Sequence, residues 1–482
     1  MTTTAADHGA VPVGARSTTV VRVRDGRFVY AFAVLYGAIY FAAASAMYLH
    51  YLAPRYDLGN MVQVVWSTAH GHVLRMSDAS GADISRLGAH ADPFLVLLTP
   101  LWWVWSSPLV LFAAQAFAVA SGALPVYWLS RKHLKDNRFA AAFSVAYLLY
   151  IPTQCNAFDF YGVHAVSFAI PFILFAVWFL DNGRLVAFAA FALLAASTKE
   201  EIGAAVAGLG IWYALRRGER RVGACVFVAG AGISLFNFLV VIPHFAVGGK
   251  SPFTARYAAV GGTPGGMVQT AFTHPSAYVD QLATWHNLLF LVLMLAPFLG
   301  LWAFEPLMLV GAVPDLAVNL LSSHSSQSTI FGHYTAGITP FVVAASILGA
   351  AKVKRRRFVG PALIGVAFML MVGGPLLYAT LLDDPGVGRQ VDAMRQAKQL
   401  IPPNASVSAS RSLGGDVSTR RTVMLFPQVA GAQWVLVGPP TEFDQSRAFQ
   451  LRLAQLESSR QWTKTFDRSG VELFRRAAGG RS

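Results

Sequence analysis

The chain has 482 residues, of which 55% are hydrophobic and only 13% are charged, and its formal net charge is +14 at pH 7. Soluble domains carry about 25% charged residues, so this composition excludes a chain that folds entirely in water. The charge does not indicate nucleic-acid binding, because the basic residues before Asp383 form short clusters between apolar segments, as in the cytoplasmic loops of membrane proteins.

The N-terminal part of the chain predicts a cytoplasmic start. Residues 1–27 are polar and basic and are expected to be disordered. The first apolar run, from Phe28 to about Tyr51, is long enough to cross a bilayer, which takes about 20 residues. No cleavage site of small residues follows it, so no cleavable signal peptide is expected.

Residues 28–382 are predicted to form a transmembrane domain of about eleven helices, with long outer loops at 52–99 and 246–286. The later spans are expected at 100–129, 139–151, 165–180, 185–197, 202–215, 222–245, 288–304, 307–321, 335–351 and 358–382. The basic clusters fall on the turns that this topology assigns to the cytoplasm. Cys155 and Cys225 are then poorly placed to pair, and no disulfide is expected.

From residue 383 to 482 the composition becomes that of a soluble domain. Helices are predicted at 392–400 and 446–462, strands at 406–410, 422–425 and 434–437, and a hairpin at 463–474. The sequence of this region contains no phosphate-binding glycine loop, metal-ligand cluster or nucleophile motif. The chain is therefore predicted to be a polytopic α-helical membrane protein with a small C-terminal α/β domain outside the cytoplasm.

Polar residues that could carry chemistry gather on the predicted outer side. Asp57 follows the first span, where a carboxylate could act as a general base or hold a divalent cation; the alternative is an N-cap for the helix that follows. His90 could bind a phosphate or, with Asp57, a metal such as Mg²⁺ or Mn²⁺. Asp92-Pro93 favours an ordinary helix start.

Further along the chain, Asp159 and His164 lie at one outer turn and are expected either to line the same cavity or to form a plain polar turn. Lys199-Glu200-Glu201 interrupts about 30 apolar residues, which costs about 2.5–3.5 kcal/mol per charge at a helix centre. We interpret Lys199 as a phosphate contact; a solvated hairpin tip is the alternative.

The second outer loop and the segment before the tenth span supply the last candidates. Arg256 could clamp a phosphate. The glycine run at 261–266 could hinge a lid or be a plain flexible loop. His333 and Tyr334 are expected to line the outer cavity.

These motifs carry a resemblance. Tyr56-Asp57-Leu58-Gly59, Gly88-Ala89-His90, Asp159-Phe160, Thr198-Lys199-Glu200, Ser251-Pro252 and His333-Tyr334, in this order, resemble the prokaryotic membrane proteins grouped as domain of unknown function 2079. That family in turn looks like the GT-C superfamily, which takes sugars from polyprenyl-phosphate carriers at the outer membrane face.

The GT-C resemblance implies roles for particular residues. Asp57 matches the essential aspartate of the first outer loop, and Thr198-Lys199 matches a Thr-Lys pair of lipid-linked-sugar transferases. The sequence departs from that pattern at Glu200-Glu201, where related transferases have a small residue and proline. The implied protein is a glycosyltransferase of a bacterial plasma membrane, with a polyprenyl-phosphate sugar donor, an envelope glycan or lipid acceptor, and an inverting reaction.

Two other classes of function stay open. A transporter or lipid flippase would favour internal repeats and polar groups near the midplane. No repeat is seen and the polar groups gather at one face, although Asp315 lies within a predicted span. An assembly factor whose C-terminal domain binds envelope partners is also compatible with the sequence.

Overall fold

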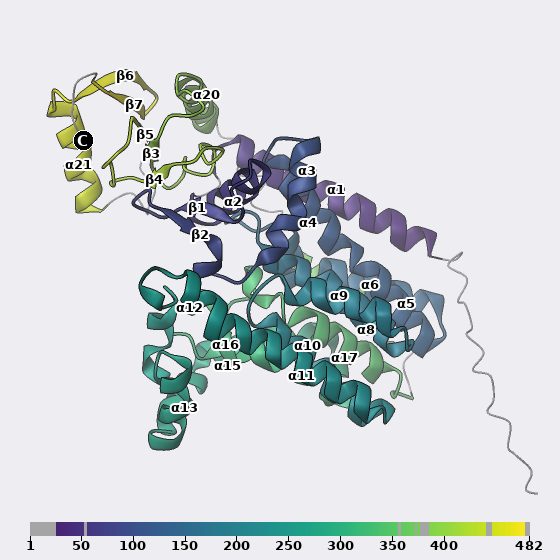
Figure 1. Ribbon diagram of the computed structural model, residues 1–482. Coiled ribbons are helices and arrows are strands. Elements are labelled where there is room, and N and C mark those ends of the chain that lie inside the picture. The colour runs from purple at the N-terminus through teal and green to yellow at the C-terminus, as the bar shows by residue number, and fades with distance from the viewer. Residues whose placement is uncertain are drawn as a thin grey trace, which may run out of the picture.

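The computed structural model describes residues 26–52, 55–354, 358–371, 374–375, 385–439 and 446–477. Figure 1 shows most helices gathered in one body, with a β-sheet and its two helices at one end of it. The first half of the helical body consists of α1 (Arg27–Leu49), α2 (Asn60–Ala69), α3 (Thr99–Val104), α4 (Leu109–Ser121), α5 (Ala123–Leu134), α6 (Asn137–Leu149), α7 (Ile151–Ala157), α8 (Ala169–Asp181) and α9 (Leu185–Ala196).

The second half of the body continues with α10 (Ile202–Arg217), α11 (Arg220–Phe236), α12 (Ile242–Phe245), α13 (Pro264–Thr273), α14 (Ser276–Leu282), α15 (Trp285–Leu295), α16 (Val313–Leu320), α17 (Thr339–Ala350) and α18 (Val359–Met371). One hydrophobic core runs through this body from Val29 to Ala367. Every residue of α17 is buried, so this helix lies at the centre of the bundle.

Three predicted spans are confirmed as helices that are long and apolar enough to cross a membrane: Arg27–Leu49, Leu109–Leu134 and Arg220–Phe245. A bent pair, Ser276–Leu282 with Trp285–Phe298, would make a fourth within the described residues. Most other predicted spans correspond to shorter apolar helices, such as Leu185–Ala196 and Thr339–Ala350. The count of eleven therefore stays a prediction, and part of the last span lies outside the described residues.

Two buried carboxylates, Asp181 and Glu305, connect helices at one end of the bundle. Their basic partners are Lys132, His133 and Arg217 for Asp181, and Arg216 and Lys352 for Glu305. All five come from clusters that the sequence assigns to the cytoplasmic side. The structure thus gathers these basic groups around shared acidic partners.

The C-terminal region forms a five-stranded sheet in the order β4-β3-β5-β7-β6. Its elements are α20 (Pro385–Gln399), β3 (Val407–Ala409), β4 (Val423–Leu425), β5 (Trp434–Val437), α21 (Arg447–Ser458), β6 (Trp462–Arg468) and β7 (Val471–Arg476). Strand β3 pairs in parallel with β4 and β5, and β7 is antiparallel to β5 and β6. The predicted strands and hairpin are confirmed, and α20 begins earlier than expected.

A short hairpin from the first predicted outer loop connects the sheet to the helices. Strands β1 (Arg75–Ser77) and β2 (Asp83–Ser85) lie with α2 between the bundle and the sheet (Figure 1). The Leu425 amide donates to the Ala79 carbonyl at 3.0 Å. Ser77 Oγ donates to the Arg421 carbonyl at 2.9 Å and accepts from the Val423 amide at 3.1 Å. The C-terminal sheet is therefore held against the loop that carries Asp57.

Candidate functional site

Asp57 lies in a π-helical turn, Arg55–Gly59, that leads into α2. The Leu58 amide donates to the Tyr161 carbonyl at 3.0 Å, so this turn is fixed against the loop after α7. Gly162 makes the approach possible: it has φ +111°, and a Cβ there would lie 2.5 Å from the Leu58 Cβ. The first outer loop and the Asp159 loop thus form one unit.

The carboxylate of Asp57 does not cap α2. The N-cap position of α2 is Gly59, with no side-chain hydrogen bond, so the N-cap interpretation of Asp57 is wrong. Burial, reinforced by the nearby Asp159 carboxylate, raises the pKa of Asp57 to about 6. Arg86, Arg411 and His90 act in the opposite direction. A carboxylate with this pKa changes protonation state close to neutral pH.

The helix start predicted at Asp92-Pro93 is confirmed, since Asp92 occupies the N-cap position of a 3₁₀ helix, Pro93–Leu98, but the Asp92 side chain makes no capping hydrogen bond. The Asp92 carboxylate accepts hydrogen bonds from Arg86 at both oxygens, at Oδ2 from Nη2 at 2.7 Å and Nε at 2.9 Å and at Oδ1 from Nε at 3.2 Å, and both side chains are buried. The Asp92 carboxylate pairs with Arg86 and does not cap the helix, because the buried guanidinium would otherwise be left without a partner.

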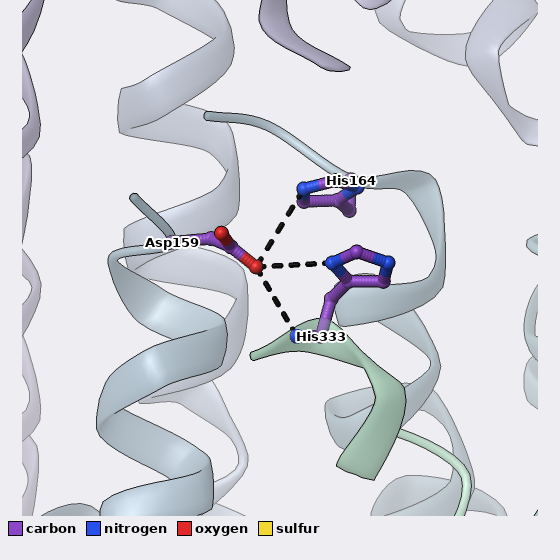
Figure 2. A group of neighbouring side chains, drawn as sticks. All are labelled: Asp159, His164 and His333. Carbon is purple, nitrogen blue, oxygen red and sulfur yellow. Dashed lines mark hydrogen bonds and ion pairs between the residues drawn. The ribbon is translucent and has the colours of Figure 1, made fainter. Parts of the chain in front are cut away.

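Asp159, His164 and His333 form a compact cluster from two distant parts of the chain (Figure 2). Asp159 Oδ2 lies 3.0 Å from His333 Nδ1 and 3.6 Å from His164 Nε2, and it accepts from the His333 amide at 3.1 Å. The Tyr161 amide donates to the other carboxylate oxygen at 2.8 Å. The two imidazole rings stack with centroids 3.6 Å apart.

The turn between α9 and α10 brings its three charges inside the protein. Lys199, Glu200 and Glu201 are 9%, 6% and 3% exposed, so the solvated-tip interpretation is wrong. Lys199 Nζ pairs with Glu201 at 2.5 Å. Glu200 accepts from the Ala91 amide at 3.0 Å and lies 2.9 Å from His90 Nδ1. Ion pairing offsets the cost of burying these charges.

Arg256 differs from Lys199 in the groups that its charge contacts. Its guanidinium lies 4.5 Å from the centroid of the Phe253 ring, and its Nη1 donates to Gln327 Oε1 at 3.3 Å. Phe253 also stacks with the His90 ring, with the two ring centroids 4.6 Å apart. Among the described residues Arg256 has no carboxylate partner. It is a positioned cation whose charge is available to an anion.

His333 shows how closely these segments converge. Its pKa is lowered, first by burial and then by the charges of four groups from three segments of the chain: Lys199, His90, Arg256 and Arg86. Tyr334, the next residue, lies under the Lys199 ammonium at 5.8 Å from its ring centroid. The predicted residues thus connect as His90 with Glu200, Lys199 with Tyr334, and Asp159 with His164 and His333.

Three site residues were not predicted from sequence: Arg86, Glu201 as the partner of Lys199, and Arg411. Arg411 stands 5.7 Å from the Tyr56 ring centroid and acts on Asp57 from the C-terminal region. No sequence signal could have identified Arg411, because its position depends on how that region docks. Arg86 had a signal, since a lone arginine six residues before Asp92 can pair with it.

The side chains that could hold a metal ion gather at a place other than the predicted one. Within the described ranges, the group of His, Cys, Asp and Glu side chains close enough to hold an ion is Asp159, His164 and His333, with ligand atoms within 4.8 Å of one another. Asp57 and His90 are not part of this group. His90 Nδ1 is instead engaged with Glu200.

Comparisons with known proteins agree on a fold. The structure of ArnT from Cupriavidus metallidurans bound to undecaprenyl phosphate matches with a TM-score of 0.57 and 12% identity, covering 95% of this chain and 100% of that one. The apo form of the same protein matches with a TM-score of 0.55 and 11% identity, over 93% and 97% of the two chains. Both are GT-C glycosyltransferases, so the fold is similar to theirs.

Of the two sequence comparisons, one found a match and the other did not. A search of curated proteins found no significant match. A family model described as "Predicted membrane protein (DUF2079)" matches residues 48–473, which is most of the chain and includes the motifs from Tyr56 to His333. The family resemblance predicted from those motifs is thereby confirmed: the chain belongs to the DUF2079 family of membrane proteins.

Proposed function

We propose that this protein is a membrane glycosyltransferase of GT-C type that transfers a sugar from a polyprenyl-phosphate donor to an envelope acceptor at the outer face of the membrane. The observation that carries the proposal is the convergence of one carboxylate of raised pKa, Asp57, with cationic groups from several separate loops. A base and an anion site side by side are what glycosyl transfer from a lipid phosphate requires. The ArnT-like fold supports the same class.

Asp57 is the general base in this proposal. It accepts the proton of the acceptor hydroxyl as that oxygen attacks the anomeric carbon, and the bond from that carbon to the phosphate oxygen breaks. A single displacement inverts the anomeric centre. A pKa of about 6 suits the role, because the carboxylate is then mostly ionised at neutral pH yet basic enough to take the proton.

Arg256 is the direct phosphate contact in this proposal, and Lys199 acts beside it. The Lys199 ammonium already has Glu201 as its partner, whereas the Arg256 guanidinium is held by Phe253 and Gln327 without a carboxylate. A planar guanidinium can donate two parallel hydrogen bonds to phosphate oxygens. The departing lipid phosphate would gain both this contact and the field of the neighbouring Lys199 ammonium.

The remaining predicted residues position these groups. Glu200 fixes the His90 ring and the Ala91 amide, which orients the loop that faces Phe253. Tyr334 lies against the Lys199 ammonium, and Asp159 ties the His333 segment to the loop that carries Tyr161. These contacts hold the loops together in one arrangement, which lowers the cost of binding a charged substrate.

The test is lipid binding by the purified chain in detergent. Undecaprenyl phosphate should bind wild type, whereas undecaprenol, which lacks the phosphate, should bind far more weakly. Arg256→Ala should weaken phosphate binding about 10- to 100-fold, the value of one or two hydrogen bonds to a charged group. Lys250→Ala removes an exposed cation from the same loop and should change nothing. Asp57→Asn should still bind the lipid.

Equal binding of the phosphate and the alcohol would contradict the anion site. The transporter alternative would then gain weight, because Lys199 and Glu201 lie within electrostatic reach of buried Asp315. Uptake of a labelled substrate by reconstituted vesicles would test that alternative. Transfer of a labelled sugar from a lipid-phosphate donor to cell-envelope acceptors would test the reaction itself.

A further inference from the structure

The cluster of Asp159, His164 and His333 leaves one polar atom unexplained. Asp159 is satisfied without His164, since its oxygens already accept from the Tyr161 amide, the His333 amide and the His333 ring. His164 Nε2 points at the same carboxylate oxygen from 3.6 Å (Figure 2) and has no hydrogen-bond partner. Its residue is only 5% exposed. Burying a polar nitrogen without a partner costs free energy, so its retention needs a reason.

We propose that Asp159, His164 and His333 bind a divalent transition-metal ion of the zinc class. Zinc binds imidazole nitrogen and carboxylate oxygen at about 2.0–2.2 Å, which puts neighbouring ligand atoms of a tetrahedral site about 3.4 Å apart. The distances from Asp159 Oδ2 to the two ring nitrogens, 3.0 and 3.6 Å, bracket this value. All three ligand atoms lie within 4.8 Å of one another.

The donor set selects the kind of ion. Two imidazoles with one carboxylate favour zinc and similar transition metals, whereas Mg²⁺ and Ca²⁺ prefer oxygen ligands. Three protein ligands leave a fourth coordination position for a ligand from solution. The site is therefore distinct in chemistry as well as in place from a magnesium or manganese site at Asp57 and His90.

The surroundings hold the ligands in place, and carboxylates neutralise two of the cations near them. The Tyr161 amide holds the second oxygen of Asp159, and the His164 amide donates to Gln115 Oε1 at 2.7 Å, so the backbone on both sides is fixed. Among the cations that act on His333, Lys199 pairs with Glu201 and Arg86 pairs with Asp92, whereas Arg256 contacts Phe253 and Gln327. A bound ion would thus meet little uncompensated positive charge from Lys199 and Arg86.

The experiment measures metal in the full-length chain after removal of any histidine tag. Protein stripped with EDTA and exposed to ZnCl₂ should hold one tight equivalent by mass spectrometry of the eluted metal. Competition against a chromophoric chelator gives its Kd. His164→Ala and His333→Ala should each weaken binding at least about 100-fold, since even the loss of a supporting residue costs 10- to 100-fold. His70→Ala is the matched control: this exposed histidine bonds only within its own helix, and binding should be unchanged.

Unfolding of the variants is excluded by size-exclusion elution and by melting without zinc. If they do misfold, X-ray absorption at the zinc edge of wild type decides: two imidazole nitrogens are expected in the first shell. A first shell without imidazole, zinc equally tight in both variants, or displacement of zinc by millimolar Mg²⁺ would each overturn the assignment. Metal content needs neither lipid nor sugar, so its failure would leave the transferase proposal standing.

Discussion

At the scale of single residues, the raised pKa of Asp57 sets a pH dependence. Burial first, and then the Asp159 carboxylate, disfavour the ionised form, so Asp57 is protonated below about pH 6. A general base works only when deprotonated. We therefore expect kcat/KM for sugar transfer to rise with pH through about 6 and then level, and Asp57→Asn to remove activity at every pH.

The matched measurement for Asp57 is a full pH profile of wild type together with the melting temperature of the variant. Asn keeps the shape of the side chain and lacks the charge, so folding should survive. Activity of Asp57→Asn near the wild-type rate, or a profile that falls as pH rises through 6, would reject the general-base role.

A second residue-scale prediction concerns the buried pair of Arg86 and Asp92. Its side chains are 8% and 2% exposed. Removing one partner leaves a buried charge, which costs about 3–5 kcal/mol, whereas replacing both by apolar residues is often close to neutral. Asp92→Ala should therefore destabilise the protein strongly, and Arg86→Met with Asp92→Leu should recover most of the loss. Reversible unfolding in mixed micelles measures both, and equal loss in the single and double variants would contradict the account.

The sequence identified many individual site residues but few of their contacts. Asp159 and His164 share one turn, so their proximity follows from a separation of five positions. His333 comes from a segment more than 160 residues later, and its place beside them depends on the packing of α7 and α8 against the chain before α17. The Lys199 turn was interpreted as a phosphate contact, yet only the structure shows that Glu201 already neutralises the ammonium.

At the scale of elements, helices α10 and α11 pack through glycine. A Cβ on Gly210 would lie 2.5 Å from the Gly223 carbonyl oxygen, and a Cβ on Gly203 would lie 2.7 Å from that of Gly230. The backbones therefore touch at two places. Small residues at such crossings are typical of membrane helices, where close backbone approach supplies van der Waals contact in place of the hydrophobic effect.

Side chains at these crossings should force the two helices apart. We expect Gly210→Val to destabilise the protein by about 1–3 kcal/mol, the usual cost of overpacking. Gly232→Val in the partner helix α11 is the control, since nothing lies within 4 Å of a Cβ there. Thermal melting in detergent compares them, and a control that loses as much as Gly210→Val would show that valine itself, and not the crossing, is responsible.

Long apolar elements were predictable because their length alone identifies them, as α1 and the helix over Arg220–Phe245 illustrate. The helices inside residues 52–99 were harder to predict. That segment was expected to be a long outer loop in which a helix could follow Asp57, and it contains α2 together with the β1–β2 hairpin and two 3₁₀ segments. These elements are held in place by contacts with the distant C-terminal sheet, such as the hydrogen bond from the Leu425 amide to the Ala79 carbonyl. The local sequence does not predict such contacts.

At the scale of the whole molecule, Gln63 connects the bundle side to the C-terminal sheet. Its amide nitrogen donates to the carbonyls of Arg420 and Arg421 at 3.0 Å, and its oxygen accepts from the Ser77 amide at 2.9 Å. The side chain is buried, and its loss removes these three hydrogen bonds, at a cost of about 1–3 kcal/mol, although the Arg421 carbonyl keeps its bond from Ser77 Oγ. Gln63→Ala should therefore loosen the docked edge of the sheet.

Hydrogen exchange can locate this effect. The amides of Val423 and Leu425 bond across the interface, so they should exchange about 10-fold faster in Gln63→Ala. The Val407 amide bonds within the sheet and should change less. Gln433→Ala, inside the C-terminal region, should leave the interface amides unchanged. Uniform acceleration of all these amides would indicate loss of the whole fold instead of undocking.

The orientation of the molecule in the membrane is the last prediction, and the proposed function depends on it. Asp181 and Glu305 gather the basic groups of several loops at one end of the bundle, while Asp57, Asp159 and His333 belong to the segments that the predicted topology puts at the other. Basic loops stay in the cytoplasm, so the Asp57 site should face outward.

Single cysteines can report this orientation in a chain with Cys225→Ser. They are placed at Ser80, in the β1–β2 turn, and at Glu219, between α10 and α11. Both positions are exposed, and Cys155 is buried.

In right-side-out membrane vesicles, an impermeant maleimide should label Ser80→Cys at once and Glu219→Cys only after detergent is added. Labelling of both without detergent would mean leaky vesicles, which a cytoplasmic marker enzyme detects. The reverse pattern would put Asp57 and the cationic loops in the cytoplasm. A transferase using a lipid carrier at the outer face would then be excluded, even if the chain bound polyprenyl phosphate, because the base and the acceptor would lie on opposite sides of the membrane.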